Sequence, residues 1–167
     1  MQEEFKIITD FENYEVSNLG NVRNIETKRI LKHRVNDGGY CRAALVSLGK
    51  TSHKLMHRLV AQEFLENPDD KMFIDHIDGN RQNNYVSNLR YATKIENNRN
   101  AVIRKDNTSG NKGVYFRSKN NVWSASISID GKLKHLGLFK NKEDAIQCRL
   151  IKANEIYGLF VNACEKV

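Results

Sequence analysis

The chain of 167 residues lacks the long apolar runs that mark membrane-spanning proteins. No run approaches the roughly 18–20 residues that a helix needs to cross a bilayer. The chain begins MQEEFKIITDFENYEV, which is acidic and mixed, whereas a secretory signal places basic residues before an apolar stretch. We therefore expect a cytoplasmic protein with no membrane partner.

Cysteine and proline are also scarce. Cys41, Cys148 and Cys164 lie far apart and form no CxxC pair, which disfavours both a disulfide framework and a structural zinc site. The only proline is Pro68, so extended proline-rich linkers are absent. Length and cysteine usage together indicate one or two domains in a reducing compartment.

Positive charge, in contrast, is in excess. Lysine and arginine number 27 against 20 aspartate and glutamate residues, and the net charge of +7 favours polyanionic partners. Between Lys112 and Lys140 six basic residues stand against one acid, and Tyr115 and Trp123 lie among them. Basic residues interleaved with aromatic ones are typical of nucleic-acid binding. Judged by charge alone, a solvated strand face accounts for this stretch equally well.

Residues 1–64 are predicted to form short strands followed by a helix. Residues 1–50 place turn pairs such as Ser17-Asn18 and Gly20-Asn21 between short apolar runs, which indicates antiparallel β-structure. Residues 55–64 repeat apolar side chains every three or four positions, which indicates a helix that ends before Pro68.

The middle segment, residues 72–105, is predicted to form strand, loop, strand and helix. The strands cover 72–77 and 89–92, the loop between them is crowded with asparagine, and the helix covers 94–105. The first strand ends near the adjacent pair Asp75-His76, which sets a carboxylate beside an imidazole. Such a pair is either a hydrated surface turn or a place where a metal ion and a histidine activate water.

The last segment opens with DNTSGNKG, residues 106–113, which is a linker by composition. Three strands are predicted over 112–118, 122–130 and 133–139, with Asp130-Gly131 as a hairpin turn. A helix capped by Asn141 and stopped by Gly158 follows. Its predicted apolar face consists of Ala145, Cys148, Ile151 and Ile156.

Several motifs resemble known families. HRLVA, DHIDGN, NN, NLR and EN follow one another over residues 56–101 as in the HNH endonuclease family of phage introns and free-standing mobile genes. FENYEVSNLGNVRN is similar to the NUMOD group of modules that precede such nucleases, and SGNKGVYFRSKNNVWSASISIDGKLKHLGLFKNKEDAIQCR resembles the ethylene-response-factor DNA-binding domain. The resemblances imply an α+β protein of the host cytoplasm with three parts: a β-rich DNA-binding module over 1–54, a ββα-metal nuclease domain over 55–105 and a three-stranded antiparallel sheet packed on one helix over 106–167.

The HNH resemblance also implies roles for single residues. His76 would be the general base that deprotonates the attacking water, and Asp75 a ligand of one divalent metal ion. Asn88 would complete the catalytic motif by holding the loop through side-chain hydrogen bonds. Asn97 falls on the helix position of the second ligand, where many relatives carry histidine, so the chain resembles an H-N-N variant. An amide oxygen still suits a hard cation, which favours Mg²⁺ or Mn²⁺ over zinc.

These residue types suit phosphodiester hydrolysis on chemical grounds as well. A neutral histidine can take the proton of an attacking water, which contributes about 10²–10⁴-fold, and one divalent ion can neutralise the phosphate and the departing 3′ oxygen. The expected products carry 5′-phosphate and 3′-hydroxyl ends. Neighbouring strand residues point to opposite faces, so Asp75 and His76 need a bend such as Asp78-Gly79 to share a site. His57 lies among apolar helix residues and is expected to be a buried, hydrogen-bonded histidine rather than a catalytic one.

Double-stranded DNA is the expected partner, bound by a monomer. The candidate contacts are Arg23, Lys32, Arg90, Tyr115, Arg117, Lys119, Lys132, Lys134 and His135. Strand alternation would place six side chains on the outward face of the C-terminal sheet, namely Tyr115, Arg117, Lys119, Ser126, Ser128 and His135. Arg90 either braces the ββα unit or touches a phosphate, and the sequence does not separate these roles.

The leading hypothesis is a site-specific, metal-dependent DNA endonuclease of the homing type. A non-cutting DNA-binding regulator on an HNH scaffold is the main alternative, and the presence of Asp75, His76, Asn88 and Asn97 speaks against it. A protein that binds or cuts structured RNA is a third hypothesis. The resemblance of the C-terminal segment to a duplex-DNA reader disfavours it.

Overall fold

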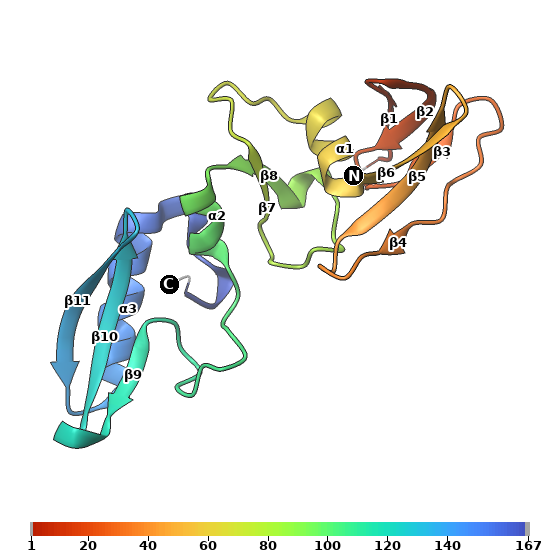
Figure 1. Ribbon diagram of the computed structural model, residues 1–167. Coiled ribbons are helices and arrows are strands. Elements are labelled where there is room, and N and C mark those ends of the chain that lie inside the picture. The colour runs from red at the N-terminus through yellow and green to blue at the C-terminus, as the bar shows by residue number, and fades with distance from the viewer. Residues whose placement is uncertain (1, 166–167) are drawn as a thin grey trace. The chain divides into compact units, whose positions relative to one another are not determined.

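The computed structural model describes residues 2–165 and has the predicted α+β fold, with several small antiparallel sheets (Figure 1). It divides into two compact units, of which the first ends at Thr93 and the second begins at Lys94. Over the described residues, every helix is too short or too polar to span a bilayer.

The first unit contains the predicted short strands, and they form three sheets. One sheet has the order β1-β2-β3 and consists of β1 (Phe5–Ile8), β2 (Phe11–Ser17) and β3 (Val22–Asn24). The second has the order β4-β5-β6 and consists of β4 (Arg34–Val35), β5 (Cys41–Ser47) and β6 (Lys50–Leu55). The third is the antiparallel pair of β7 (Phe73–His76) and β8 (Leu89–Ala92).

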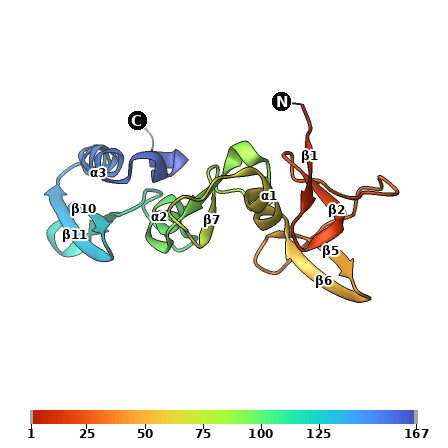
Figure 2. The same ribbon diagram turned by 90° about the horizontal axis from the view of Figure 1, so that it is seen from above.

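Helix α1 (Met56–Phe64) joins these sheets into one core, and its bounds match the predicted helix closely. Figures 1 and 2 show it beside the first two sheets, and it also contacts β7 and β8. Its buried Leu59 and Val60 pack with Ile8, Val16 and Leu45. A fully buried side chain of this kind contributes about 1.5–3 kcal/mol. The N-terminal sheets and the β7–β8 hairpin therefore fold around a common apolar centre.

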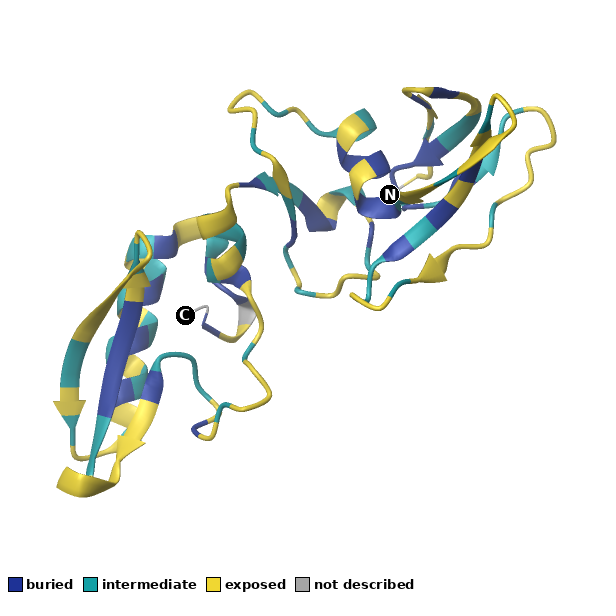
Figure 3. Ribbon diagram, viewed as in Figure 1, coloured by how far each residue is buried: buried dark blue, intermediate teal, exposed yellow. Residues whose placement is uncertain are grey.

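The second unit begins with α2 (Lys94–Asn100), which ends earlier than the predicted helix over 94–105. Three strands follow as predicted in the order β11-β10-β9: β9 (Val114–Arg117), β10 (Val122–Ile129) and β11 (Lys132–Phe139). Helix α3 (Lys142–Tyr157) packs on this sheet, and buried residues concentrate where α3 meets the central strand β10 (Figure 3). Asp130 and Gly131 both have positive φ, so the predicted hairpin turn is confirmed.

The buried face of α3 differs from the prediction. Ile151 is 63% exposed, so its assignment to the apolar face is wrong. The buried face repeats every fourth residue and consists of Ala145, Arg149, Ala153 and Tyr157. Arg149 belongs to this face because a carboxylate inside the unit pairs with it, Glu165 at 2.9 Å. A hydrophobic pattern has no means of marking a buried arginine.

Two local predictions within the second unit also need correction. Asn141 occupies the N-cap position of α3, but its side chain makes no capping hydrogen bond and instead donates to Asp144. The segment 106–113 is an ordered turn, because Asn107 Oδ1 accepts from the Gly110 amide at 2.7 Å and Ser109 Oγ donates to the Asn111 carbonyl at 2.9 Å. The predicted stop of α3 at Gly158, with φ of 51°, is confirmed.

Candidate functional site

The pair Asp75 and His76 lies at the end of β7, and both side chains are buried. The strand stops there because the chain turns at once. The Gly79 amide donates to the His76 carbonyl at 2.8 Å, and the φ of Gly79 is 75°, a conformation that glycine adopts without strain. The bend that the sequence requires therefore follows directly after His76.

Asn88 fastens the loop that follows this turn. Its Oδ1 accepts from the Asp78 amide at 3.0 Å, and its Nδ2 donates to Asp78 Oδ1 at 2.9 Å and to the Asn83 carbonyl at 2.8 Å. The Ile77 amide donates to the Asn88 carbonyl at 2.8 Å. These are the loop-holding hydrogen bonds expected of Asn88, and they fix the backbone on both sides of Asp78.

The loop is also tied to the N-terminal sheets. Arg81 donates from Nη1 to the Gly38 carbonyl at 2.7 Å, and its guanidinium lies 4.9 Å from the ring centre of Tyr40. The Val86 amide donates to the Asn18 carbonyl at 2.8 Å. Turns that are far away in the sequence thus support the segment around His76.

The protonation of His76 is set by Asn84 and by burial. The ring Nε2 lies 3.4 Å from Asn84 Oδ1, and Asn84 is oriented by its own donation to the Gln82 carbonyl at 3.0 Å. Because this orientation turns an acceptor toward Nε2, we assign the proton to Nε2 and the lone pair to Nδ1. Burial lowers the pKa of His76, against the opposing effects of Asn84, Asp78 and Asp75. The imidazole is therefore neutral near neutral pH.

The rings of Tyr40 and His57 lie beside the ring of His76. The ring centres of His57 and His76 are 5.1 Å apart, those of Tyr40 and His57 5.0 Å, and those of Tyr40 and His76 6.0 Å. Burial lowers the pKa of His57 to about 3, and its buried Nδ1 has no hydrogen-bond partner among residues 2–165. His57 is thus buried as predicted, without the hydrogen bond expected for this nitrogen.

Asp75 is engaged by the residue opposite it on β8. Arg90 donates from Nε to Asp75 Oδ2 at 2.8 Å, and its Nη2 lies 2.6 Å from the same oxygen. Asp75 and Arg90 are cross-strand partners in the register of β7 and β8, so the pairing follows from the hairpin itself. Of the two roles left open for Arg90, bracing the ββα unit matches these contacts.

The donor atoms suit a hard divalent ion. Asp75 offers a carboxylate, and Asn97, half-buried on α2 of the second unit, offers an amide oxygen. No three His, Cys, Asp or Glu side chains among residues 2–165 group as a metal site would require. Carboxylate and amide oxygens are ligand types that a hard cation accepts, and water and substrate phosphate would complete its coordination.

The candidate DNA contacts of the first unit differ in availability. Arg23 is paired with Glu15 at 2.6 Å, and its guanidinium lies 3.5 Å from the ring centre of Phe5. Lys32 is exposed in the segment between β3 and β4. Lys32 is therefore free to approach a phosphate, whereas Arg23 must first leave its carboxylate.

The sheet of the second unit separates its candidate contacts onto two faces. Tyr115 pairs with Ser124 and His135 with Ser126, on the face opposite α3. Lys132 and Lys134 pair with Ile129 and Ile127, on the face that carries core residues. Exposed Arg117 donates to the Tyr115 hydroxyl at 3.3 Å, and Lys119 lies on a short 3-10 turn, residues 118–120. Ser128 is exposed as expected, but Ser126 is covered by its neighbours, with 5% of its surface accessible.

Sequence reasoning missed Tyr40 and assigned Asn84 to ordinary loop chemistry. Neither residue carries a local signal, because each contacts the site only through the tertiary fold. Asn84 is recognisable in hindsight as the second member of the Asn83-Asn84 pair, one of which holds the loop while the other meets His76.

Comparisons with known proteins find similar sequences over most of the chain. A family model described as HNH endonuclease matches residues 54–99, and one described as the NUMOD4 motif matches residues 3–46. DNA endonuclease I-HmuI of Bacillus phage SP01 is 36% identical over 129 residues, which cover 77% of this chain and 74% of that protein. An uncharacterised HNH endonuclease of Acanthamoeba polyphaga mimivirus, L245, is 39% identical over 122 residues, and the chain spans only 34% of its length.

A solved structure is similar as well. It is described as DNA binding and cleavage by the HNH homing endonuclease I-HmuI, and the match has a TM-score of 0.54 at 33% identity. The alignment covers 86% of this chain and 82% of that one. The likeness thus extends beyond the segment around His76 to most of the chain.

Proposed function

The chain belongs to the HNH endonuclease family, and from that premise we propose that it is a site-specific, metal-dependent DNA endonuclease of the homing type. Its substrate is double-stranded DNA, and its products carry 5′-phosphate and 3′-hydroxyl ends. The names of its phage relatives support both the substrate and the homing role.

His76 acts as the general base. Its ring is neutral because burial lowers its pKa, and Asn84 directs the ring proton to Nε2, so Nδ1 can accept the proton of an attacking water. Asn88 serves this step indirectly, since its three side-chain hydrogen bonds hold the backbone after His76 in one conformation. The observation that carries the proposal is this buried neutral histidine at the rim of a loop fastened by asparagine.

Asp75 would hold one Mg²⁺ or Mn²⁺ ion, and the sequence motif suggests Asn97 as its second protein ligand. The ion, when bound, neutralises charge on the scissile phosphate and the departing 3′ oxygen. Arg90 orients the Asp75 carboxylate through Oδ2.

A plasmid assay tests the proposal. Supercoiled plasmid carrying the genomic region around the gene is incubated with the protein and Mg²⁺ or Mn²⁺, with EDTA and with the Asp75→Ala variant in parallel lanes. We expect metal-dependent cutting at a defined position by the wild type alone. Binding of the same DNA without cutting under any divalent ion would instead identify a regulator built on the HNH scaffold.

The C-terminal sheet is proposed as the ethylene-response-factor-like reader of the target. The exposed pair Tyr115 and Arg117 on the face opposite α3 supports this role, because the roughly 12 Å wide major groove admits a β-ribbon. Arg117→Ala should weaken specific binding by about 1–3 kcal/mol if it contacts a guanine edge. Equal losses on specific and random duplexes would assign Arg117 to the phosphate backbone.

A further inference from the structure

Helix α2 has little apolar packing to hold it in place. Only one of its residues, Asn100, is buried, and Ile95 is 46% exposed. A short helix in water depends on tertiary packing for its stability. Polar contacts must therefore contribute to the order of α2.

Two residues distant in the sequence, Lys112 and Asn162, donate hydrogen bonds to the C-terminal end of α2. Lys112 donates from Nζ to the Arg99 carbonyl at 3.1 Å. Asn162 donates from Nδ2 to the Asn100 carbonyl at 2.5 Å, and the same nitrogen lies 3.2 Å from Asn100 Oδ1. Carbonyls in the last turn of a helix have no partner within it, so these donors cap α2 from outside.

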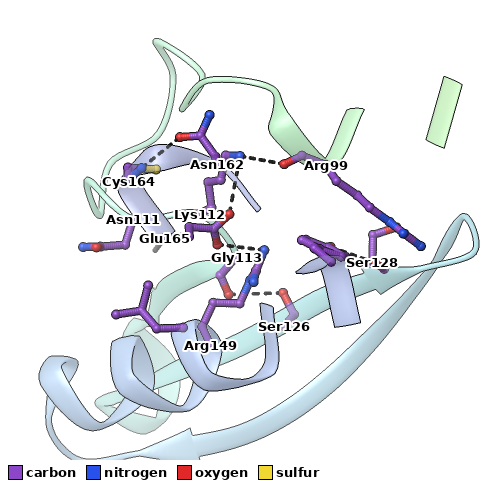
Figure 4. Close-up of polar contacts among 12 residues, drawn as sticks. Arg99, Asn111, Lys112, Gly113, Ser126, Ser128, Arg149, Asn162, Cys164 and Glu165 are labelled. Atoms are coloured by element: carbon purple, nitrogen blue, oxygen red, sulfur yellow. Dashed lines mark hydrogen bonds and ion pairs between the residues drawn. The ribbon is translucent and has the colours of Figure 1, made fainter. Parts of the chain in front are cut away.

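We call the contacts of Lys112 and Asn162 with the end of α2 the clamp. A buried carboxylate beside Lys112 supports the clamp, and Figure 4 shows these residues together. Glu165 is only 3% exposed, and its carboxylate lies 3.5 Å from Lys112 Nζ and 2.9 Å from Arg149 Nη2. Asn154 on α3 donates to the Glu165 carbonyl at 2.6 Å. Removing one member of a buried ion pair leaves a charge without compensation, so the loss of Lys112 or Arg149 should destabilise the buried Glu165 carboxylate.

We propose that Lys112 and Asn162 are positioning residues that fix α2, and with it Asn97, for metal binding. The inference rests on the proposed function, in which Asn97 is a ligand. A ligand held by a rigid support binds more tightly than one on a loose segment, because less ordering is needed when the ion arrives. The C-terminal module thereby serves the cutting reaction as well as DNA reading, since it supplies both donors.

The test uses the full chain with Asn162→Asp, which keeps the side-chain volume and the acceptor for the Cys164 amide but removes the donor to Asn100. Amide hydrogen exchange should quicken on the order of tenfold in the last turn of α2. The Mg²⁺ concentration that gives half-maximal cleavage should rise by a similar factor, while DNA affinity stays near the wild-type value. Lys112→Met, a second variant, should change both quantities in the same direction.

Lys152→Ala is the matched control, because it removes a cation that pairs with Glu155 on the surface of α3 and leaves the clamp intact. It should change neither quantity. Unchanged exchange in Asn162→Asp and Lys112→Met would overturn the clamp. Faster exchange with unchanged metal dependence would overturn its role in metal binding. A wild-type protein that does not cut refutes the proposed function, and with it the metal-binding role, and this failure appears without any variant.

Discussion

Acid should destabilise the first unit through the buried ring of His57. Burial, followed by the nearby His76 and Arg58, lowers the pKa of His57 to about 3. Unfolding exposes the ring and returns its pKa to about 6.5. Between these two values the unfolded chain binds a proton that the folded unit does not, so protonation favours unfolding.

The size of the effect follows from the two pKa values of His57. Above about pH 6.5, protonation of His57 does not lower the free energy of unfolding. Below about pH 6.5, the free energy of unfolding falls by about 1.4 kcal/mol per pH unit, until the pH approaches about 3. Between about pH 7.5 and pH 5 the loss is about 2 kcal/mol. A folded-state pKa of about 4 instead of about 3 would leave this loss of about 2 kcal/mol unchanged, because His57 in the folded unit is neutral at pH 5 in either case.

His57→Leu removes the titrating group and keeps a side chain of similar size against Tyr40. Urea unfolding is followed by circular dichroism, since the only tryptophan, Trp123, lies in the second unit. We expect the wild type to lose about 2 kcal/mol more than His57→Leu between about pH 7.5 and pH 5. His53→Leu, an exposed position on β6, is the control and should keep the wild-type dependence. Equal pH dependence in wild type and His57→Leu would refute the claim that burial holds this ring neutral.

Three further substitutions test backbone geometry and the loop. Leu48 is 99% exposed with φ of 49°, so Leu48→Asn should stabilise the first unit by about 0.5–1 kcal/mol in urea unfolding, because asparagine tolerates this conformation better; a loss of stability would contradict this. Asn88→Ala removes three side-chain hydrogen bonds, each worth about 1 kcal/mol, and should lower both the stability and the cleavage rate; wild-type cleavage would remove Asn88 from the motif. Gly113→Ala would put its Cβ against the Ser126 carbonyl, whereas Gly110→Ala meets nothing within 4 Å, so Gly113→Ala should lower the melting temperature further; equal melting would contradict the close approach.

Local patterns predicted most of the secondary structure. The strand at 89–92, the hairpin turn at Asp130-Gly131 and the stop at Gly158 depend on the chemistry of a few neighbouring residues, and all three are observed. Ile151 was assigned to the wrong face because a pattern of apolar residues passes over Arg149, whose burial depends on Glu165. A partner sixteen positions away leaves no trace in helical periodicity.

The candidate site shows the same division. The motif around Asp75 and His76 is contiguous, so the sequence predicted the turn and the loop that Asn88 holds. The rings of Tyr40 and His57 belong to other parts of the chain and contact His76 only when the unit folds. The composition of residues 106–113 predicts a linker, because it does not reveal that Asn107, Ser109 and Asn111 form hydrogen bonds with one another in an ordered turn.

The rate of DNA cutting by His76→Ala tests the central claim most directly. Single-turnover cleavage of a duplex carrying the mapped site is measured with saturating Mg²⁺, and the affinity for the same duplex is measured in Ca²⁺. We expect a loss of about 10²–10⁴-fold in rate with affinity close to wild type, because the variant lacks only the proton acceptor. Cutting by His76→Ala near the wild-type rate would show that another group activates the water.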